Sequence, residues 1–196
     1  MHLIWKASLV EILFIGLGLA FFGVQAEGLH WAIRWSARFS AFLFLVAFLA
    51  SSLQRSLHRP WTSALLRQRR YWGLAFAVSQ LIHLALIFLA YRQAPETMGP
   101  VNGAFLLGGL GYFFTALMAL SSNDASVRWL GLKRWRLLHS IGMYLLWAIF
   151  FGTYVLGFGQ NSLHRVLAVA FALALVFKLK AKLGKRKISW ERSCPR

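Results

Sequence analysis

The chain has 196 residues, of which 59% are hydrophobic and only 14% are charged, and its net charge is +17. A soluble domain of this size carries about 25% charged residues, so the long apolar runs exclude an ordinary soluble domain and indicate a membrane protein. The basic residues lie between the apolar runs, where they direct topology, and do not form the basic face that nucleic-acid binding requires. The single cysteine, Cys194, excludes a disulfide framework and a cysteine-based metal site.

Six apolar segments are each long enough to form a transmembrane helix. We therefore expect one all-α integral membrane domain over residues 1–196, a six-transmembrane-helix bundle with a basic tail at 180–196. The first apolar run is too long for a typical cleaved signal peptide, so its helix is expected to stay in the protein. The predicted helices cover residues 7–24, 35–53, 71–91, 104–120, 137–156 and 163–179.

The connections between these segments have distinct compositions. Gln54–Arg70 has five arginines, no acid and an apolar edge that includes Trp61, which predicts a short amphipathic helix on the membrane surface. Pro95 and Pro100 predict a loop between the third and fourth helices. Within the fourth segment, glycines allow a neighbouring backbone or a flat ligand to approach closely: Gly108, Gly109 and Gly111.

The distribution of lysine and arginine predicts the orientation of the bundle. Alternate connections place 18 of them on the side that holds both termini and four on the other side. Since positive residues are concentrated in cytoplasmic loops, both termini are expected in the cytoplasm.

Two histidines stand out in the apolar segments, and an ionisable side chain in a membrane is by default a functional-site hypothesis. His83 lies well inside the third segment, and His139 lies near the start of the fifth. The five acids of the chain are too few inside the segments for a typical proton-coupled transporter. A neutral imidazole is a good axial ligand for haem iron, and helical bundles build cofactor sites from facing helices. The alternative is that His83 hydrogen-bonds a neighbouring helix and that His139 is interfacial.

Helical spacing identifies neighbours of these two histidines. Ser79 and Gln80 share a helix face with His83, so either is expected to orient its imidazole through the second ring nitrogen. Gly142 shares the face of His139 and leaves room for the edge of a porphyrin. His164 begins the sixth segment, where a histidine is more often interfacial than coordinating.

Several short motifs have the order and spacing of a known family. They are Ser36-Ala37-Arg38; Arg69-Arg70 with Gly73-Leu74 ahead of His83; and Ser121-Ser122, Leu130–Lys133, Trp135 and Leu138-His139 with Tyr144. With these residues the chain resembles the ferric reductase-like transmembrane domain superfamily. It is most similar to the haem-binding membrane subunit of the bacterial protein-methionine-sulfoxide reductase system (the MsrQ family).

The resemblance implies a bacterial inner-membrane protein that binds b-type haem and transfers single electrons as the membrane subunit of an oxidoreductase. His83 and His139 occupy the positions of the family's haem ligands. A separate flavin reductase or quinol would donate the electrons, a periplasmic oxidoreductase would accept them, and FMN is a further cofactor in the family. A quinone-linked or ferric reductase-type cytochrome b is the alternative in the same class. A haem-free membrane scaffold or transporter subunit is the alternative in another class.

The chain also departs from the family. Gly152 and Thr97 stand where two-haem relatives carry further histidines, which predicts one haem per chain and leaves His164 as the only obvious substitute ligand. A haem near the cytoplasmic side would have four arginines available to its propionates: Arg69, Arg70, Arg134 and Arg136. Arg38 would serve a haem near the midplane. Two ligands of one iron must lie at similar depth in the membrane, whereas His83 and His139 lie at different distances from the nearest arginines. The difference in depth shrinks if Arg69–Trp72 runs along the surface, and shrinks further if Arg134 and Arg136 extend to the surface from inside the fifth helix.

Overall fold

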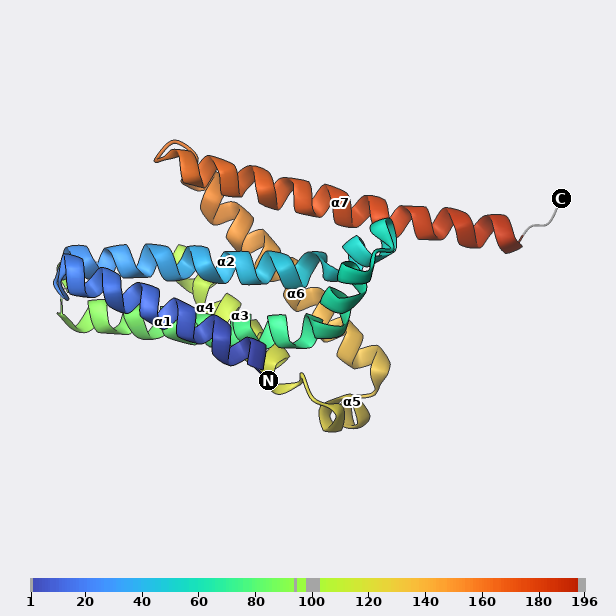
Figure 1. Ribbon diagram of the computed structural model, residues 1–196, viewed down its shortest axis with the longest axis horizontal. Coiled ribbons are helices and arrows are strands. Elements are labelled where there is room, and N and C mark those ends of the chain that lie inside the picture. The colour runs from blue at the N-terminus through green and yellow to red at the C-terminus, as the bar shows by residue number, and fades with distance from the viewer. Residues whose placement is uncertain (1, 94, 98–102, 194–196) are drawn as a thin grey trace. The chain divides into compact units, whose positions relative to one another are not determined.

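The computed structural model describes residues 2–93, 95–97 and 103–193, and Figure 1 shows that they form helices joined by short connections. No strand occurs in these three ranges. The helices are α1 (His2–Phe22), α2 (Ala26–Leu57), α3 (Pro60–Gln93), η1 (Pro95–Thr97), α4 (Gly103–Leu120), α5 (Asp124–Leu130), α6 (Leu132–Leu156) and α7 (Ser162–Ser193). The prediction of an all-helical chain is confirmed for the described residues.

The expected surface helix within Gln54–Arg70 is not a separate element. Helix α2 continues to Leu57 and α3 begins at Pro60, so only His58 and Arg59 lie between them. The chain reverses its direction tightly between these two helices, at His58, which has a positive φ of 48°. The Arg59 N–H donates to Thr62 Oγ1 at 3.1 Å, and proline suits the first position of a helix. Arginine and glutamine are good helix formers, which explains why this polar connection stays helical.

Four helices are long and apolar enough to cross a membrane: α1, α2, α3 and α6. A fifth span results if α4 and α5 are counted together, although these two helices meet at a bend of 101°. This finding supports a multi-pass membrane protein with four or five candidate spans among the described residues. Helix α7 is not among these candidate spans, although its first half is apolar and its second half is rich in lysine and arginine.

The helices group into two compact units. Unit 1 comprises Met1–Phe44 and Arg70–Leu146, and unit 2 comprises Leu45–Arg69 and Trp147–Arg196. Helices α2, α3 and α6 each contribute to both units. His83 and His139, the two histidines of interest, belong to unit 1, whereas His164 belongs to unit 2.

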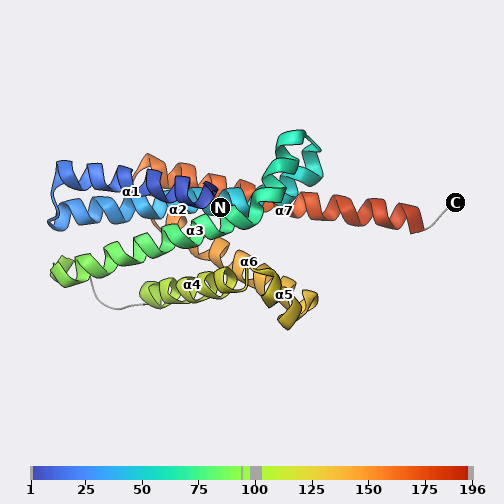
Figure 2. The ribbon, with the colours of Figure 1, turned by 60° about the horizontal axis from the view of Figure 1, so that its bottom comes forward.

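In unit 1, α1 and the first part of α2 pack against α3, and the views in Figures 1 and 2 both show these three helices side by side. Their apolar core contains Ile15, Ala32 and Leu86, one residue from each helix. Gly18 of α1 allows the indole ring of Trp31 to lie directly on the helix backbone, where any side chain at position 18 would collide with it. These contacts fix the face of α2 that meets α3.

In unit 2, the end of α6 and the start of α7 form a helical hairpin. Phe171 is fully buried, and its ring packs against Phe150 and Tyr154 of α6. The indole N–H of Trp147 donates to the Phe171 carbonyl at 2.9 Å, which adds a polar contact between the two helices. The hairpin turns at Gly157, where a side chain would collide with the imidazole of His164.

Candidate functional site around two intramembrane histidines

Helices α2 and α3 place Ser36 against His83. The hydroxyl Oγ of Ser36 lies 2.8 Å from Nδ1 of His83, and Ser36 is fully buried. The same hydroxyl donates to the Ile33 carbonyl one turn earlier in α2, at 3.0 Å. While this hydroxyl donates its one proton to the Ile33 carbonyl, it can only accept a hydrogen bond from His83. Nδ1 of His83 therefore carries the ring proton, and Nε2 carries the lone pair that a metal ligand requires.

The predicted orienting residues of His83 make other contacts. Ser79 Oγ donates to Glu11 Oε1 at 2.8 Å, and Gln80 Nε2 donates to Ser40 Oγ at 3.2 Å. Both residues lie one turn from His83, as the helical spacing predicted. Their polar groups nevertheless bond to residues of α1 and α2. The hydrogen bond that orients the imidazole of His83 therefore comes from Ser36, and not from Ser79 or Gln80.

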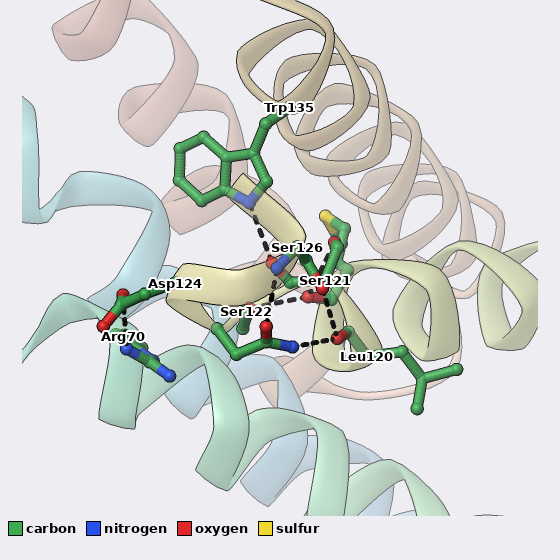
Figure 3. Close-up of polar contacts among 9 residues, drawn as sticks. Arg70, Leu120, Ser121, Ser122, Asp124, Ser126 and Trp135 are labelled. Atoms are coloured by element: carbon green, nitrogen blue, oxygen red, sulfur yellow. Dashed lines mark hydrogen bonds and ion pairs between the residues drawn. The ribbon is translucent and has the colours of Figure 1, made fainter. Parts of the chain in front are cut away.

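The end of α4 holds His139 in a comparable way. Oγ of Ser121 lies 3.1 Å from Nε2 of His139, and the Ser121 carbonyl accepts the indole N–H of Trp135 at 2.9 Å. Figure 3 shows Ser121 and Trp135 joined by this second bond. The Trp135 ring also packs on the imidazole, with 4.3 Å between ring centroids and a tilt of 32°. Ser121 and Trp135 thus fix the position of His139 at the start of α6.

The protonation pattern of His139 differs from that of His83. The Ser121 hydroxyl donates to the Leu117 carbonyl at 2.7 Å, so it accepts a hydrogen bond from Nε2 of His139. In this orientation Nε2 of His139 carries a ring proton. Coordination through Nε2 requires the ring to turn so that the two nitrogens exchange places. His83 is therefore arranged for coordination as it stands, and His139 after a ring rotation.

A capped corner leads the chain from α4 into α5 and α6. Asn123 caps α5, because its side-chain oxygen accepts the Ser126 N–H at 2.7 Å. Gly131, with a positive φ of 76°, ends the same helix. Arg70 of α3 reaches this corner and pairs with Asp124 at 3.4 Å, as Figure 3 shows. The pair is exposed, at 47% and 84% of the two side chains, so it contributes less than about 1 kcal/mol.

The space next to Gly142 is filled by the protein itself. A Cβ atom at this position would come within 2.6 Å of Met118 Sδ from α4. The glycine thus accommodates a methionine, whereas the sequence predicted room for a porphyrin edge. Met118 is flexible, so a flat ligand here would have to displace it. By contrast, a Cβ at Gly108 or Gly109 would have no neighbour within 4 Å, so neither glycine supports a close backbone contact.

The predicted propionate-binding arginines are divided between the units. Arg70, Arg134 and Arg136 belong to unit 1. Helix α6 begins at Leu132, so Arg134 and Arg136 lie inside it as expected, whereas Arg69–Trp72 is part of the continuous helix α3 and not a separate surface segment. Arg69 belongs to unit 2, where its Nε donates to the Ala47 carbonyl at 3.1 Å. The Arg38 guanidinium lies over the ring of Trp35, 4.8 Å from its centroid.

The positions linked to a second haem offer little coordination chemistry. Gly152 lies in α6 and has no side chain, and Thr97 ends η1. The imidazole Nδ1 of His164 lies 2.8 Å from Asn161 Oδ1 at the start of α7. Among the described residues, no three of histidine, cysteine, aspartate and glutamate gather into a metal-binding cluster, although axial ligation of haem needs only two imidazoles.

Sequence reasoning missed the roles of Ser36, Ser121 and Trp135. All three are within the motifs that carry the family resemblance, yet their contacts with the histidines depend on which helices are neighbours. For Ser36 the available signal was a serine inside a long apolar segment, because a polar group there must find a hydrogen-bond partner. In comparisons with family models, curated proteins and solved structures, nothing matches this chain.

Proposed function

We propose that this protein is a b-type haem membrane protein that transfers single electrons, as the membrane subunit of an oxidoreductase resembling the methionine-sulfoxide reductase system. One observation carries the proposal. His83 and His139 lie in different apolar helices of the same unit, and each is fixed through one ring nitrogen by a buried or half-buried serine hydroxyl. Second-nitrogen hydrogen bonds of this kind accompany almost all metal-ligating histidines.

The residues around the two histidines fit a haem. Ser36 keeps the proton of His83 on Nδ1 and so directs the Nε2 lone pair away from α2. Trp135 limits the imidazole of His139 to orientations that pack on its ring. Arg70 pairs with the exposed Asp124, and Arg134 and Arg136 are exposed, so these three cations are the candidates to pair with propionates. When bound, the haem would supply the one-electron couple that this function requires.

The proposed setting is the inner membrane of a bacterium, with six spans and both termini in the cytoplasm. In addition to α1, α2, α3 and α6, this arrangement uses α4 as the fourth span and the apolar first half of α7 as the sixth. The charge difference of 18 against four across the connections supports it. Helix α5 would then lie at the cytoplasmic surface, between the fourth and fifth spans.

The partners follow from the same proposal. A separate flavin reductase or a quinol would donate electrons, and a periplasmic oxidoreductase would accept them, with FMN as a further cofactor. Gly152 lacks a side chain to hold a second iron, so one haem would serve the whole path across a hydrocarbon core of about 30 Å. Quinone-linked or ferric reduction therefore stays as the alternative within this class.

The test is the visible spectrum of the full chain purified from its membrane, recorded oxidised and then reduced with dithionite. We expect a Soret band and the sharp reduced bands of six-coordinate b-type haem. A protein without these bands after expression with ample haem supply would refute the proposal. Spectra of His83→Ala and His139→Ala link the bands to the proposed ligands, because either change removes one axial imidazole.

A second candidate function is a haem-free membrane scaffold, which the serine contacts also favour. The Ser36–His83 and Ser121–His139 contacts join different helices, and intramembrane histidines serve as interhelical hydrogen-bonding groups. The two candidates differ in the outcome of histidine-to-glutamine changes. Glutamine preserves a hydrogen bond to serine but does not ligate haem iron well, so a scaffold would tolerate it and a cytochrome would lose its spectrum.

A further inference from the structure

In unit 1, the faces of α1 and α3 that meet carry polar groups as well as apolar ones. On α1, the buried residues Ser8, Glu11 and Ile15 follow one another at intervals of three and four, so they share one face. On α3, Ser79 and Leu86 are seven residues apart and also share a face. Glu11 bonds Ser79, and Ile15 lies in one core cluster with Leu86, so the two helices run in the same direction. We call this contact the α1–α3 seam.

Three buried side-chain atoms in the described part of the chain have no hydrogen-bond partner, and all three lie on the helix faces of this seam. They are Glu11 Oε2, Ser8 Oγ and Trp72 Nε1. Ser8 precedes Glu11 by three residues, or about 4.5 Å of helix, and Trp72 precedes Ser79 by seven residues, or about 10.5 Å. Because α1 and α3 run in the same direction, the polar atoms continue from Glu11 toward the start of both helices.

The carboxyl group of Glu11 has little to stabilise a negative charge. The residue is only 1% exposed, and its one hydrogen bond is the Ser79 hydroxyl, which donates to Oε1 at 2.8 Å. Burial of an ionised carboxylate requires a cation or donors to both oxygens, and a single hydroxyl does not compensate for it. A neutral carboxylic acid, with its proton on Oε2, is the form that this environment favours.

The facing helices bring two ionisable groups to the level of Glu11, and neither pairs with its carboxyl group. The Arg38 guanidinium of α2 lies over the Trp35 ring, which packs on Phe14, one turn from Glu11. His83 of α3 follows Ser79 by one turn, and its Nδ1 bonds Ser36. In the described ranges, the carboxyl group of Glu11 has no ion pair, and its Oε2 has no hydrogen bond.

We propose that Glu11 is a proton-binding site in the membrane interior, and that its proton exchanges with the solvent past Ser8. The Oε2–H bond breaks as the Ser8 hydroxyl accepts this proton and releases its own toward the start of α1. The reverse transfer restores the acid. Ser8 is 8% exposed and follows His2 by six residues, so only about 9 Å of helix separate it from the end of α1.

This site brings an exchangeable proton to a seam whose Ser79 lies one helical turn from His83. It requires neither a haem nor electron transfer. In the expected topology, the start of α1 is at the cytoplasmic surface, so the proton would come from the cytoplasm.

The experiment records infrared spectra of the full chain in a neutral detergent at neutral pH. We expect the carbonyl-stretching band of a protonated carboxylic acid, which shifts when heavy water replaces the exchangeable proton. Glu11→Gln should remove this band. The matched control is Glu27→Gln, which removes an exposed acid from the first turn of α2 and should leave the band unchanged. Because the chain has only five acids, single substitutions suffice to assign the band.

The exchange route is tested by the rate at which the band shifts after transfer to heavy water. Ser8→Ala should slow this exchange about fivefold, because the carboxyl group loses the neighbouring hydroxyl as a hydrogen-bonded relay. Thr153→Ala, which removes an exposed hydroxyl of α6, should leave the rate unchanged. An equal rate in Ser8→Ala and the wild type would overturn the route past Ser8.

The melting temperature of Glu11→Gln gives a second measurement. Glutamine keeps a carbonyl oxygen for the Ser79 hydroxyl and is neutral, so the variant should melt close to the wild type. A variant that fails to fold or melts far below the wild type would show that the ionised carboxylate is needed, which overturns the site. A wild-type spectrum without the acid band, or a band that persists in Glu11→Gln, would also overturn it. The haem spectrum bears on the proposed function alone, so the two proposals fail separately.

Discussion

Ser36 of α2 and His83 of α3 are 47 residues apart in the chain, yet their side chains lie 2.8 Å apart inside unit 1. The Ser36 hydroxyl gives its own proton to the Ile33 carbonyl and accepts the Nδ1 proton of His83. A single serine thus selects the histidine tautomer that exposes Nε2. This relationship connects the packing of two helices to the proposed chemistry of the site.

We predict that Ser36→Ala lowers the free energy of unfolding by about 1–3 kcal/mol, because the Nδ1 proton of His83 loses its buried acceptor. Chemical denaturation in detergent measures the change. Thr153→Ala is the matched control, since the exposed Thr153 hydroxyl bonds only the Ile149 carbonyl of its own helix. If the haem proposal holds, Ser36→Ala also shifts the midpoint potential, whereas Thr153→Ala does not. Equal stability of the two variants would show that Ser36 does not hold His83.

The sequence predicted where apolar helices lie better than where helices end. The bounds of α4 agree with the predicted 104–120 to within one residue, because glycine and polar residues flank that segment closely. Helix α7, predicted to end at residue 179, continues to Ser193. The residues after 179 are rich in lysine, which lowers the hydropathy of the segment. Lysine is nevertheless a good helix former, so the helix continues beyond the apolar part.

At the candidate site, the sequence likewise identified the histidines but not the side chains that contact them. Apolar context identified His83 and His139 from the sequence, and helical spacing placed Ser79 and Gln80 near His83. Spacing along one helix cannot identify a partner on another helix, so the roles of Ser36 and Ser121 were missed. Met118 beside Gly142 was missed for the same reason, because a glycine alone does not show which neighbour uses its space.

Two glycines of α6 should respond in opposite ways to the same substitution. Gly142→Ala places a methyl group 2.6 Å from Met118 Sδ, and this overpacking is expected to cost about 1–3 kcal/mol. Gly152→Ala meets nothing within 4 Å and should stabilise α6 by about 0.5–1 kcal/mol through helix propensity. Thermal unfolding of both variants measures the difference. Adding Met118→Ala to Gly142→Ala should recover part of the loss, and no recovery would place the strain elsewhere.

The charge asymmetry makes a prediction about topology. A reporter fused after Arg196 should be active only if it functions in the cytoplasm, because 18 of the 22 lysines and arginines lie in the segments that six spans would place on the side of the termini. A reporter inserted near 95–99 should be active only if it functions outside. Paired phosphatase and fluorescent-protein fusions at both sites measure this. Phosphatase activity of the C-terminal fusion would refute the six-span orientation, including the position of α7 as the sixth span.

The last prediction is the haem stoichiometry. We expect one haem b per chain, bound by His83 and His139, because Gly152 has no side chain and Thr97 offers only a hydroxyl. His83→Ala and His139→Ala should each leave a five-coordinate or empty site. His164→Ala should change little, since its imidazole contacts Asn161 and lies in unit 2. Pyridine haemochrome assays, normalised to protein, measure the ratio.

Each variant requires a folding control, because the two histidines also bond serines of neighbouring helices. His139→Gln serves here, since glutamine can retain the contact with Ser121 while removing the imidazole. A folded His139→Gln protein without haem identifies His139 as a ligand and not merely as a packing group. Two haems per chain would show that the ligand set is incomplete. Full haem occupancy in both His83→Ala and His139→Ala would refute the pair, because neither imidazole could then be required for binding.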